Sequence, residues 1–181
     1  MDLLGRGSVS SPDPGEELVE VVDDHDRVVD VVSRREIRSR RLLHRCTYVV
    51  VLDPSGRAYV HRRTTTKDVY PGFLDVMAGG VNGVGESYEV AAARELEEEL
   101  GITATPTLRF VARYDGPSGR CFGGVFDVVW DGAIVWQPEE VVEGAFHTFE
   151  EIDAMREVER FCPDGLEMFD RWRHVGITTD R

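Results

Sequence analysis

The sequence is poor in cysteine, in basic residues and in long apolar segments, and each shortage excludes a class of protein. Its three cysteines, Cys46, Cys121 and Cys162, are odd in number, far apart and not at metal-ligand spacing. They indicate reduced thiols in a cytoplasmic protein and receive no function. With 21 Lys and Arg residues against 34 Asp and Glu residues, the formal charge is −13, so long nucleic acid is not an expected partner. The sequence contains no run of about 18 apolar residues and no signal-like start, so we expect neither membrane insertion nor secretion.

A length of 181 residues suits one domain with a substantial core and is too short for two domains of ordinary size. Residues 1–15 are rich in Gly, Ser and Pro, and they contain too few apolar side chains to offset the entropy lost on ordering. We therefore predict a flexible tail over 1–15, with structure beginning near residue 17, and a single domain over 16–181.

Apolar runs and turn residues predict the elements of this domain. Two hairpins are expected, one from 18–22 and 28–32, the other from 47–52 and 58–63, with a short basic helix capped by Ser33 between them. A loop over 64–74 follows, and later strands are expected at 108–114, 121–130 and 141–147. Thr148 and Glu151 form a capping-box signal before closing helices at 150–159 and 166–175. This order predicts an α/β fold with a mixed sheet covered by helices on both faces.

The most secure helix runs from residue 87 to 100, with Ser87 placed to cap its start and Gly101 just past its end. Glu95, Glu98 and Glu99 share one face of it, at i, i+3 and i+4, whereas Glu97 points away. Three carboxylates in one turn repel one another, and hard oxygen ligands select Mg²⁺ or Mn²⁺. An ion held by only these carboxylates would keep open positions for phosphate, so the pattern predicts a phosphoryl-transfer site. The alternative is that the three side chains form a solvated acidic face.

A glycine-rich loop precedes this helix and favours the functional interpretation. Glycines stand at positions 79, 80, 83 and 85, where they permit positive φ angles and close approach to a ligand. Glu86 lies at the mouth of the helix, and Arg94 is placed to pair with it or with Glu98 one turn on. Such pairing would hold loop and helix together.

Nine residues of this segment match every fixed position of the Nudix box, G-x5-E-x7-R-E-U-x-E-E-x-G-U, where U is aliphatic: Gly80, Glu86, Arg94, Glu95, Leu96, Glu98, Glu99, Gly101 and Ile102. The chain thus resembles the Nudix hydrolase superfamily over roughly residues 17–175. The resemblance implies an α/β/α sandwich and a pyrophosphohydrolase acting on a nucleoside diphosphate linked to another moiety. It also implies Glu95, Glu98 and Glu99 as ligands of Mg²⁺ or Mn²⁺, and a catalytic set of Glu98, Arg94 and Glu86.

The flanks resemble the isopentenyl-diphosphate isomerase branch, and within it the YfcD-like hydrolases. The matching residues are His44-Arg45, Arg62-Arg63, Lys67 and Tyr70-Pro71-Gly72. By this resemblance Arg63 and Lys67 bind the substrate diphosphate, together with Gly80, and a guanidinium and an ammonium suit phosphate oxygens. The alternative for both cations is ordinary solvation.

An isomerase function is not favoured, because the chain lacks the isomerase's catalytic residues. Gly79 stands where that enzyme has its cysteine, and Val81, Gly119 and Cys121 stand where it has metal-binding His and Glu residues. His44 matches a metal-ligand His, but without co-ligands a structural histidine at a strand start is expected.

Other roles remain open. Glu140 and Glu143 are candidates for a general base, with a surface role as the alternative for each. Tyr70 and Phe73 could stack on a substrate ring or belong to the core. The competing functions are an isomerase and a non-catalytic nucleotide sensor on the same fold. The expected partner is a small diphosphate substrate, and the sequence leaves monomer and homodimer undecided.

Overall fold

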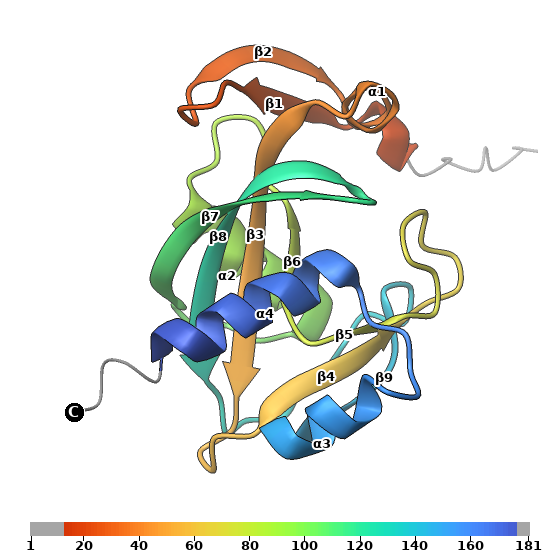
Figure 1. Ribbon diagram of the computed structural model, residues 1–181, viewed down its shortest axis with the longest axis vertical. Helices are drawn as coiled ribbons and strands as arrows, with labels where there is room; N and C mark the ends of the chain where they lie inside the picture. Colours follow the sequence, from red (N-terminus) through yellow and green to blue (C-terminus); the bar gives the residue numbers. More distant parts are fainter. Residues whose placement is uncertain (1–12, 177–181) are drawn as a thin grey trace, which may run out of the picture.

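The computed structural model describes residues 13–176 of the chain (Figure 1). Most of the predicted N-terminal tail, residues 1–15, lies outside this range. Its last residues do not behave as a tail, because Pro14–Glu16 form a short 3-10 helix, η1, after Asp13. The Asp13 side chain accepts a hydrogen bond from the Gly15 N–H at 2.8 Å. Ordered structure therefore begins before residue 17, where the sequence predicted its start.

Nine strands of the described chain form one sheet around β3. They are β1 (Leu18–Val22), β2 (Val28–Ser33), β3 (Leu43–Leu52), β4 (Ala58–Arg63), β5 (Leu74–Asp75), β6 (Ala78–Val81), β7 (Thr107–Gly116), β8 (Gly119–Val129) and β9 (Val141–His147). Strand β3 pairs antiparallel with β1, β4 and β6 and parallel with β8. The predicted mixed sheet is confirmed.

Helices cover both faces of this sheet (Figure 1). They are α1 (Arg34–Arg40), α2 (Tyr88–Leu100), α3 (Phe149–Met155) and α4 (Pro163–Gly176). Successive side chains of β3 point to opposite faces. Val49 and Val51 pack in a cluster with Leu96 of α2, whereas Tyr48 and Val50 pack in a second cluster with Phe169 and other residues of α3 and α4. The expected α/β/α layering is therefore present, with β3 as its centre.

The helix ends follow their capping residues. Ser87 Oγ accepts from the Val90 N–H at 3.3 Å, and Gly101 ends α2 at φ 64°. The capping box of Thr148 and Glu151 is complete at the start of α3.

The closing helices differ from prediction. Helix α3 stops at Met155 instead of 159, and α4 begins at Pro163 instead of 166. Between them the chain pairs with Leu74, which donates to the Arg160 carbonyl and accepts from the Cys162 N–H, both at 2.8 Å. This tertiary pairing draws 160–162 away from a helical path.

Strands β5 and β6 were not predicted. They are two and four residues long and contain Asp or Gly, so they carry no alternating pattern. Their pairing with β4 and β3 defines them. Strand β7 continues to Gly116, past its predicted end at 114, and strand β8 begins at Gly119, before its predicted start at 121. The turn between them is therefore reduced to residues 117–118. Among the described residues, no helix combines the length and apolar composition needed to cross a membrane.

We predict that Gly101→Ala costs at least about 2 kcal/mol of unfolding free energy, because it strains a left-handed residue and also crowds a neighbour. A Cβ at Gly101 would lie 2.8 Å from the Val135 carbonyl oxygen. The matched control is Gly56→Ala, which has a similar φ of 80° but nothing within 4 Å of its Cβ, so about 1 kcal/mol is expected. Urea denaturation measures both, and equal losses would contradict the packing argument.

Candidate active site

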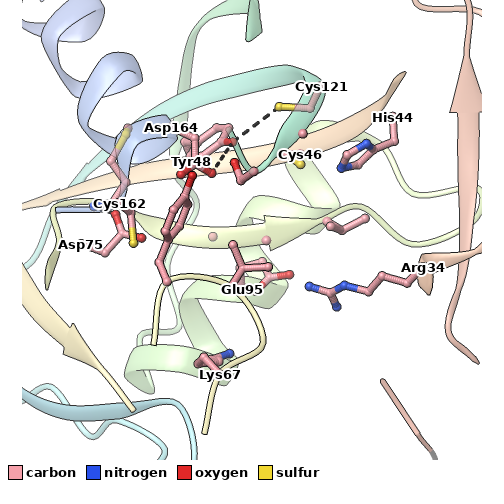
Figure 2. Close-up of a pocket in the computed structure, with 18 of the residues that line it drawn as sticks. Arg34, His44, Cys46, Tyr48, Lys67, Asp75, Glu95, Cys121, Cys162 and Asp164 are labelled. Carbon is pink, nitrogen blue, oxygen red and sulfur yellow. Dashed lines mark hydrogen bonds between the residues drawn. The ribbon is translucent and has the colours of Figure 1, made fainter. Parts of the chain in front are cut away.

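A single cavity of about 340 Å³ brings together most of the residues predicted from the sequence (Figure 2). The predicted site residues that line it are Arg63, Lys67, Gly80, Arg94, Glu95, Glu98, Glu99 and Glu140. They come from the end of β4, the loop after it, β6, helix α2 and the segment before β9. Glu86 and Glu143 are absent from the lining. The sequence thus identified one wall of a pocket whose other walls come from distant segments.

Two carboxylates of helix α2 are buried in this wall. Glu95 is 9% exposed and Glu99 is 6% exposed. The pKa of each is raised to about 7, mainly by burial, and repulsion from Glu99 is the second cause of the rise at Glu95. Lys67 is the largest opposing influence on the pKa of Glu99. Ionised carboxylates held in such a place favour an approaching cation.

The glycine segment of β6 lies directly against these carboxylates. The Gly79 N–H donates to Glu99 Oε2 at 3.1 Å, and a Cβ at Gly80 would lie 2.6 Å from Glu95 Oε1. At Gly79 a Cβ would lie 1.9 Å from the Thr47 carbonyl oxygen, so this backbone has no room for any side chain there. The position at which the isomerase carries its cysteine is therefore closed to a nucleophile in this chain.

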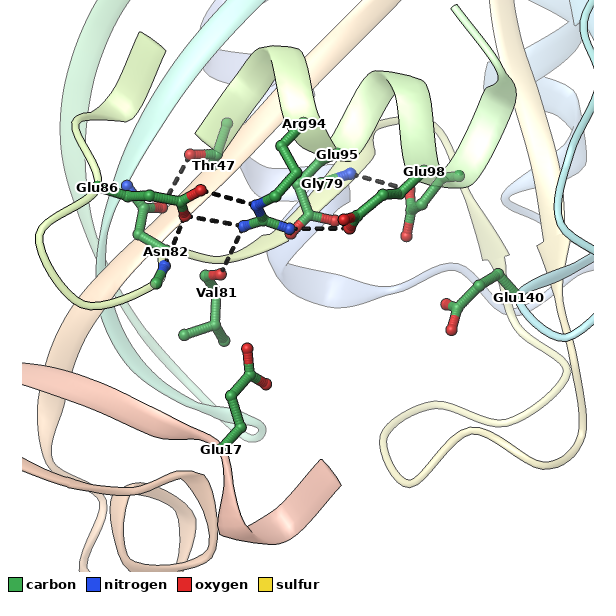
Figure 3. Close-up of polar contacts among 12 residues, drawn as sticks. Glu17, Thr47, Gly79, Val81, Asn82, Glu86, Arg94, Glu95, Glu98 and Glu140 are labelled. Atoms are coloured by element: carbon green, nitrogen blue, oxygen red, sulfur yellow. Dashed lines mark hydrogen bonds and ion pairs between the residues drawn. The ribbon is translucent and has the colours of Figure 1, made fainter. Parts of the chain in front are cut away.

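Arg94 ties the glycine loop to helix α2 (Figure 3). Its guanidinium donates to both oxygens of Glu86, at 2.8 and 2.9 Å, and to Glu95 at 2.8 Å and Glu98 at 2.9 Å. Glu86 also accepts from the Gly83 N–H at 2.6 Å. The hydrogen bonds to Glu86 are the main reason that the pKa of Arg94 is raised. The predicted attachment of loop to helix is confirmed, and Glu86 acts on the pocket through Arg94.

The three acidic side chains share a wall but do not meet at one point. Within residues 13–176, no three His, Cys, Asp or Glu side chains are grouped closely enough to hold a metal. Arg94 instead lies between Glu95 and Glu98, and Glu98 is 53% exposed. The donor chemistry nonetheless fits Mg²⁺ or Mn²⁺: all three are hard carboxylate ligands, two are buried, and Gly80 leaves the space in front of Glu95 clear.

Two cations face this acidic wall. Lys67 forms an ion pair with Glu140, and burial lowers the pKa of the Lys67 ammonium. The Arg63 guanidinium donates to the Val69 carbonyl at 3.3 Å and lies 3.9 Å from the Asp75 carboxylate. Both side chains are mainly buried and line the cavity, so the alternative of ordinary solvated cations does not describe them.

The two candidates for a general base, Glu140 and Glu143, differ in their position relative to the cavity. Glu140 lines the cavity and forms an ion pair with Lys67, and Figure 3 shows it apart from Glu98 of helix α2. Glu143 is 64% exposed, pairs with Arg62 at 2.8 Å and lies outside the lining. Glu143 therefore has the surface role that was its alternative.

Several lining residues carried no functional prediction. They include Tyr48, Asp75, Tyr114, Asp164 and all three free cysteines. Figure 2 shows Tyr48, Asp75, Asp164 and Cys162 together at one end of the cavity, called here the inner end. No local spacing pattern connects these lining residues, because they come from β3, β5, β7, β8 and the start of α4 and its preceding residue. Pairing of β3 with β8, which sets His44 opposite Cys121, accounts for part of this assembly.

The structure also shows where His44 and the aromatic residues Tyr70 and Phe73 lie. His44 is buried near the start of β3, with its Nδ1 3.1 Å from the Leu42 carbonyl, as expected for a structural histidine, although it also borders the cavity. Tyr70 and Phe73 pack against each other at 5.3 Å between ring centroids, and Tyr70 alone of the two lines the cavity.

Comparison with known proteins agrees with this geometry. The NUDIX domain model matches residues 42–169. The chain is 42% identical over 170 residues to the uncharacterised Nudix hydrolase SCO1686 of Streptomyces coelicolor, with 92% of each chain covered. It is 40% identical over 157 residues to the uncharacterised Nudix hydrolase YfcD of Escherichia coli K12, with 86% of each covered.

Among solved structures, DR0079 from Deinococcus radiodurans matches with a TM-score of 0.74 and 26% identity, over 86% of this chain and 98% of that one. The Nudix fold predicted from the sequence is thereby confirmed. Since the family model spans most of the chain and the relatives align over nearly their whole length, this chain belongs to the Nudix hydrolase family, alongside uncharacterised members of the YfcD type.

Proposed function

We propose that this protein is a pyrophosphohydrolase that uses Mg²⁺ or Mn²⁺ to cut the diphosphate link of a nucleoside diphosphate joined to another moiety, or of a similar small diphosphate. The observation that carries the proposal is the single cavity in which Glu95 and Glu99 are buried opposite Lys67 and Arg63. Carboxylates for a cation and basic groups for phosphate are the two requirements of phosphoryl transfer, which depends mainly on positioning and electrostatic stabilisation.

In this proposal Glu95, Glu98 and Glu99 would hold the ion, which supplies polarisation of the phosphate oxygens and compensation of their charge. Arg63 and Lys67 bind the diphosphate from the opposite wall, and Gly80, which lies against Glu95, lets the backbone of β6 approach the substrate. Arg94 and Glu86 keep the acidic helix in place; theirs is a positioning role, and Arg94 also borders the cavity.

Proton removal from the attacking water requires a base within the cavity. Glu98 and Glu140 are partly exposed carboxylates that line the cavity, and Glu140 lies beside the phosphate-binding Lys67. Glu140 would be released for this role when substrate phosphate takes its place beside Lys67. We also propose a cytoplasmic location, which the three free thiols support.

The metal-free protein should lose stability as pH rises from about 4.5 to about 7. In that range the unfolded chain has released the protons of Glu95 and Glu99, whose folded pKa values are raised to about 7, so the folded state binds more protons. Added Mg²⁺ should therefore raise the melting temperature more at pH 8 than at pH 5. Calorimetry tests this. No effect of Mg²⁺ at pH 8, or an effect of equal size in Glu98→Gln, would show that the metal site is wrong.

Replacing Glu99 by Gln keeps the size and helical character of the side chain but removes one negative ligand. We expect turnover to fall roughly a hundredfold or more, because loss of metal polarisation is worth several kcal/mol in the transition state. Glu97→Gln is the matched control, since Glu97 is exposed on the same helix and lies outside the cavity. The substrate for this test is identified first, by a screen for hydrolysis of dinucleoside polyphosphates, nucleotide sugars, dinucleotides and isoprenoid diphosphates. Equal rates for the two variants on that substrate would rule out the mechanism.

Arg63→Ala and Lys67→Ala should raise KM by about tenfold or more, while the stabilisation by Mg²⁺ stays nearly unchanged. The reason is that both side chains are assigned to phosphate, and charge-assisted bonds to phosphate are among the stronger hydrogen bonds. Arg62→Ala serves as the control, because the Arg62 side chain pairs with Glu143 and does not line the cavity. Loss of the metal response in either variant would overturn the assignment.

A further inference from the structure

The inner end of the cavity holds polar atoms that the protein leaves without partners. The Asp164 carboxylate accepts from the Tyr48 hydroxyl at 3.2 Å through Oδ2, but its other oxygen, Oδ1, is buried and makes no hydrogen bond. No basic side chain among residues 13–176 forms an ion pair with Asp164. The Tyr114 side chain is 3% exposed and the Tyr70 hydroxyl is buried beside it; neither has a partner at good hydrogen-bond geometry, although Ser118 lies close enough to both to oppose the rise in their pKa values.

These atoms surround one space. Asp164, Tyr48, Tyr70 and Tyr114 all line the cavity, and Asp75 borders it from β5. Figure 2 shows Tyr48, Asp75 and Asp164 gathered at one end, with Lys67 toward the other. The inner end of the cavity therefore holds two carboxylates among aromatic rings; Arg63 reaches Asp75 there at 3.9 Å, whereas Lys67 lies toward the other end.

A ligand that fills the inner end must satisfy these groups. An alkyl or isoprenoid group would leave the buried Asp164 Oδ1 and Tyr114 hydroxyl without hydrogen bonds, and unpaired buried polar atoms are unfavourable. A positively charged amine would donate to the carboxylate and lie against the tyrosine rings, whose faces attract cations.

The available space limits the size of this group. The whole cavity measures about 340 Å³, near the lower end of ligand pockets, which range over roughly 300–1,000 Å³. Since the diphosphate occupies part of it, we expect the inner end to take a short amino-alkyl chain in preference to a second nucleoside.

We propose that Asp164, Tyr48 and Tyr114 form a subsite for a compact, positively charged amine on the organic group of the diphosphate substrate. This inference rests on the proposed pyrophosphohydrolase function and names the substrate class of the same site. Asp164 is the residue that determines specificity, and the tyrosines orient the amine.

Binding is tested with methylene-bridged diphosphonate esters, which cannot be hydrolysed, measured calorimetrically with Mg²⁺ at pH 8. The 3-aminopropyl ester should bind at least about tenfold more tightly than the n-butyl and 3-hydroxypropyl esters, equivalent to about 1.4 kcal/mol. In Asp164→Asn this preference should fall to within about threefold. Equal binding of the amine and butyl esters to the wild type would overturn the subsite.

Two further variants separate recognition from folding. Tyr114→Phe removes a hydroxyl that has no partner at good hydrogen-bond geometry, so it should change the melting temperature little while weakening the amine ester several-fold. Glu167→Gln, on the same helix as Asp164 but 44% exposed and outside the cavity, should keep the full preference. An unchanged amine preference in both Asp164→Asn and Tyr114→Phe would also overturn the assignment.

Hydrolysis of the corresponding diphosphates distinguishes this inference from the proposed function. If the amine ester binds preferentially but neither amine nor butyl diphosphate, nor any pyrophosphate of the screen, is cut with Mg²⁺ or Mn²⁺, the proposed function fails and the subsite stands. If pyrophosphates are hydrolysed without binding preference for the amine, the subsite fails and the proposed function stands.

Discussion

The guanidinium of Arg94 is the group on which the arrangement of the acidic wall depends. It binds both oxygens of Glu86 at the mouth of helix α2 and reaches Glu95 and Glu98 further along the same helix. Because Glu86 also accepts from the Gly83 N–H, the loop and the helix are joined through one cation. Breaking such a network by removing one partner leaves buried charges uncompensated, which is more costly than losing an isolated surface pair.

The same constraint explains why glycine is required beside the acidic helix. Gly79 and Gly80 bring the backbone of β6 against Glu99 and Glu95, at separations that a side chain would not allow. The closeness has an energetic consequence, since two carboxylates are held away from water and their pKa values rise to about 7. The fold thus maintains a local electrostatic cost at the point where a cation is proposed to bind, and stability and function are coupled through it.

Strand β3 connects this wall to the rest of the cavity. Its alternating side chains pack against α2 on one face and against α3 and α4 on the other, so the strand is fixed from both sides. Its antiparallel partner β6 supplies the glycines, and its parallel partner β8 supplies Cys121. The cavity is therefore built on the centre of the sheet, and elements packed around β3 complete it.

Local parts of the site could be predicted from sequence. The i, i+3, i+4 spacing of Glu95, Glu98 and Glu99 put them on one wall, and Ser87 and Gly101 marked the helix ends, because both effects act within a few residues. Helix ends that depend on distant pairing could not be predicted, as the extent of α3 and α4 shows. The same applies to the short strands β5 and β6, whose hydrogen bonds lie on other strands.

What the sequence by itself determined is the acidic helix, its glycine loop and the membership of the Nudix hydrolase family. Tertiary structure alone decided that Glu140 and not Glu143 faces the cavity, that Arg94 lies between Glu95 and Glu98, and that Asp164 joins Tyr48 across the sheet. The physical reason is the distance along the chain over which each effect acts. Helical spacing and capping act over one or two turns, whereas the lining of a cavity is set by packing between segments more than a hundred residues apart, as with Tyr48 and Asp164.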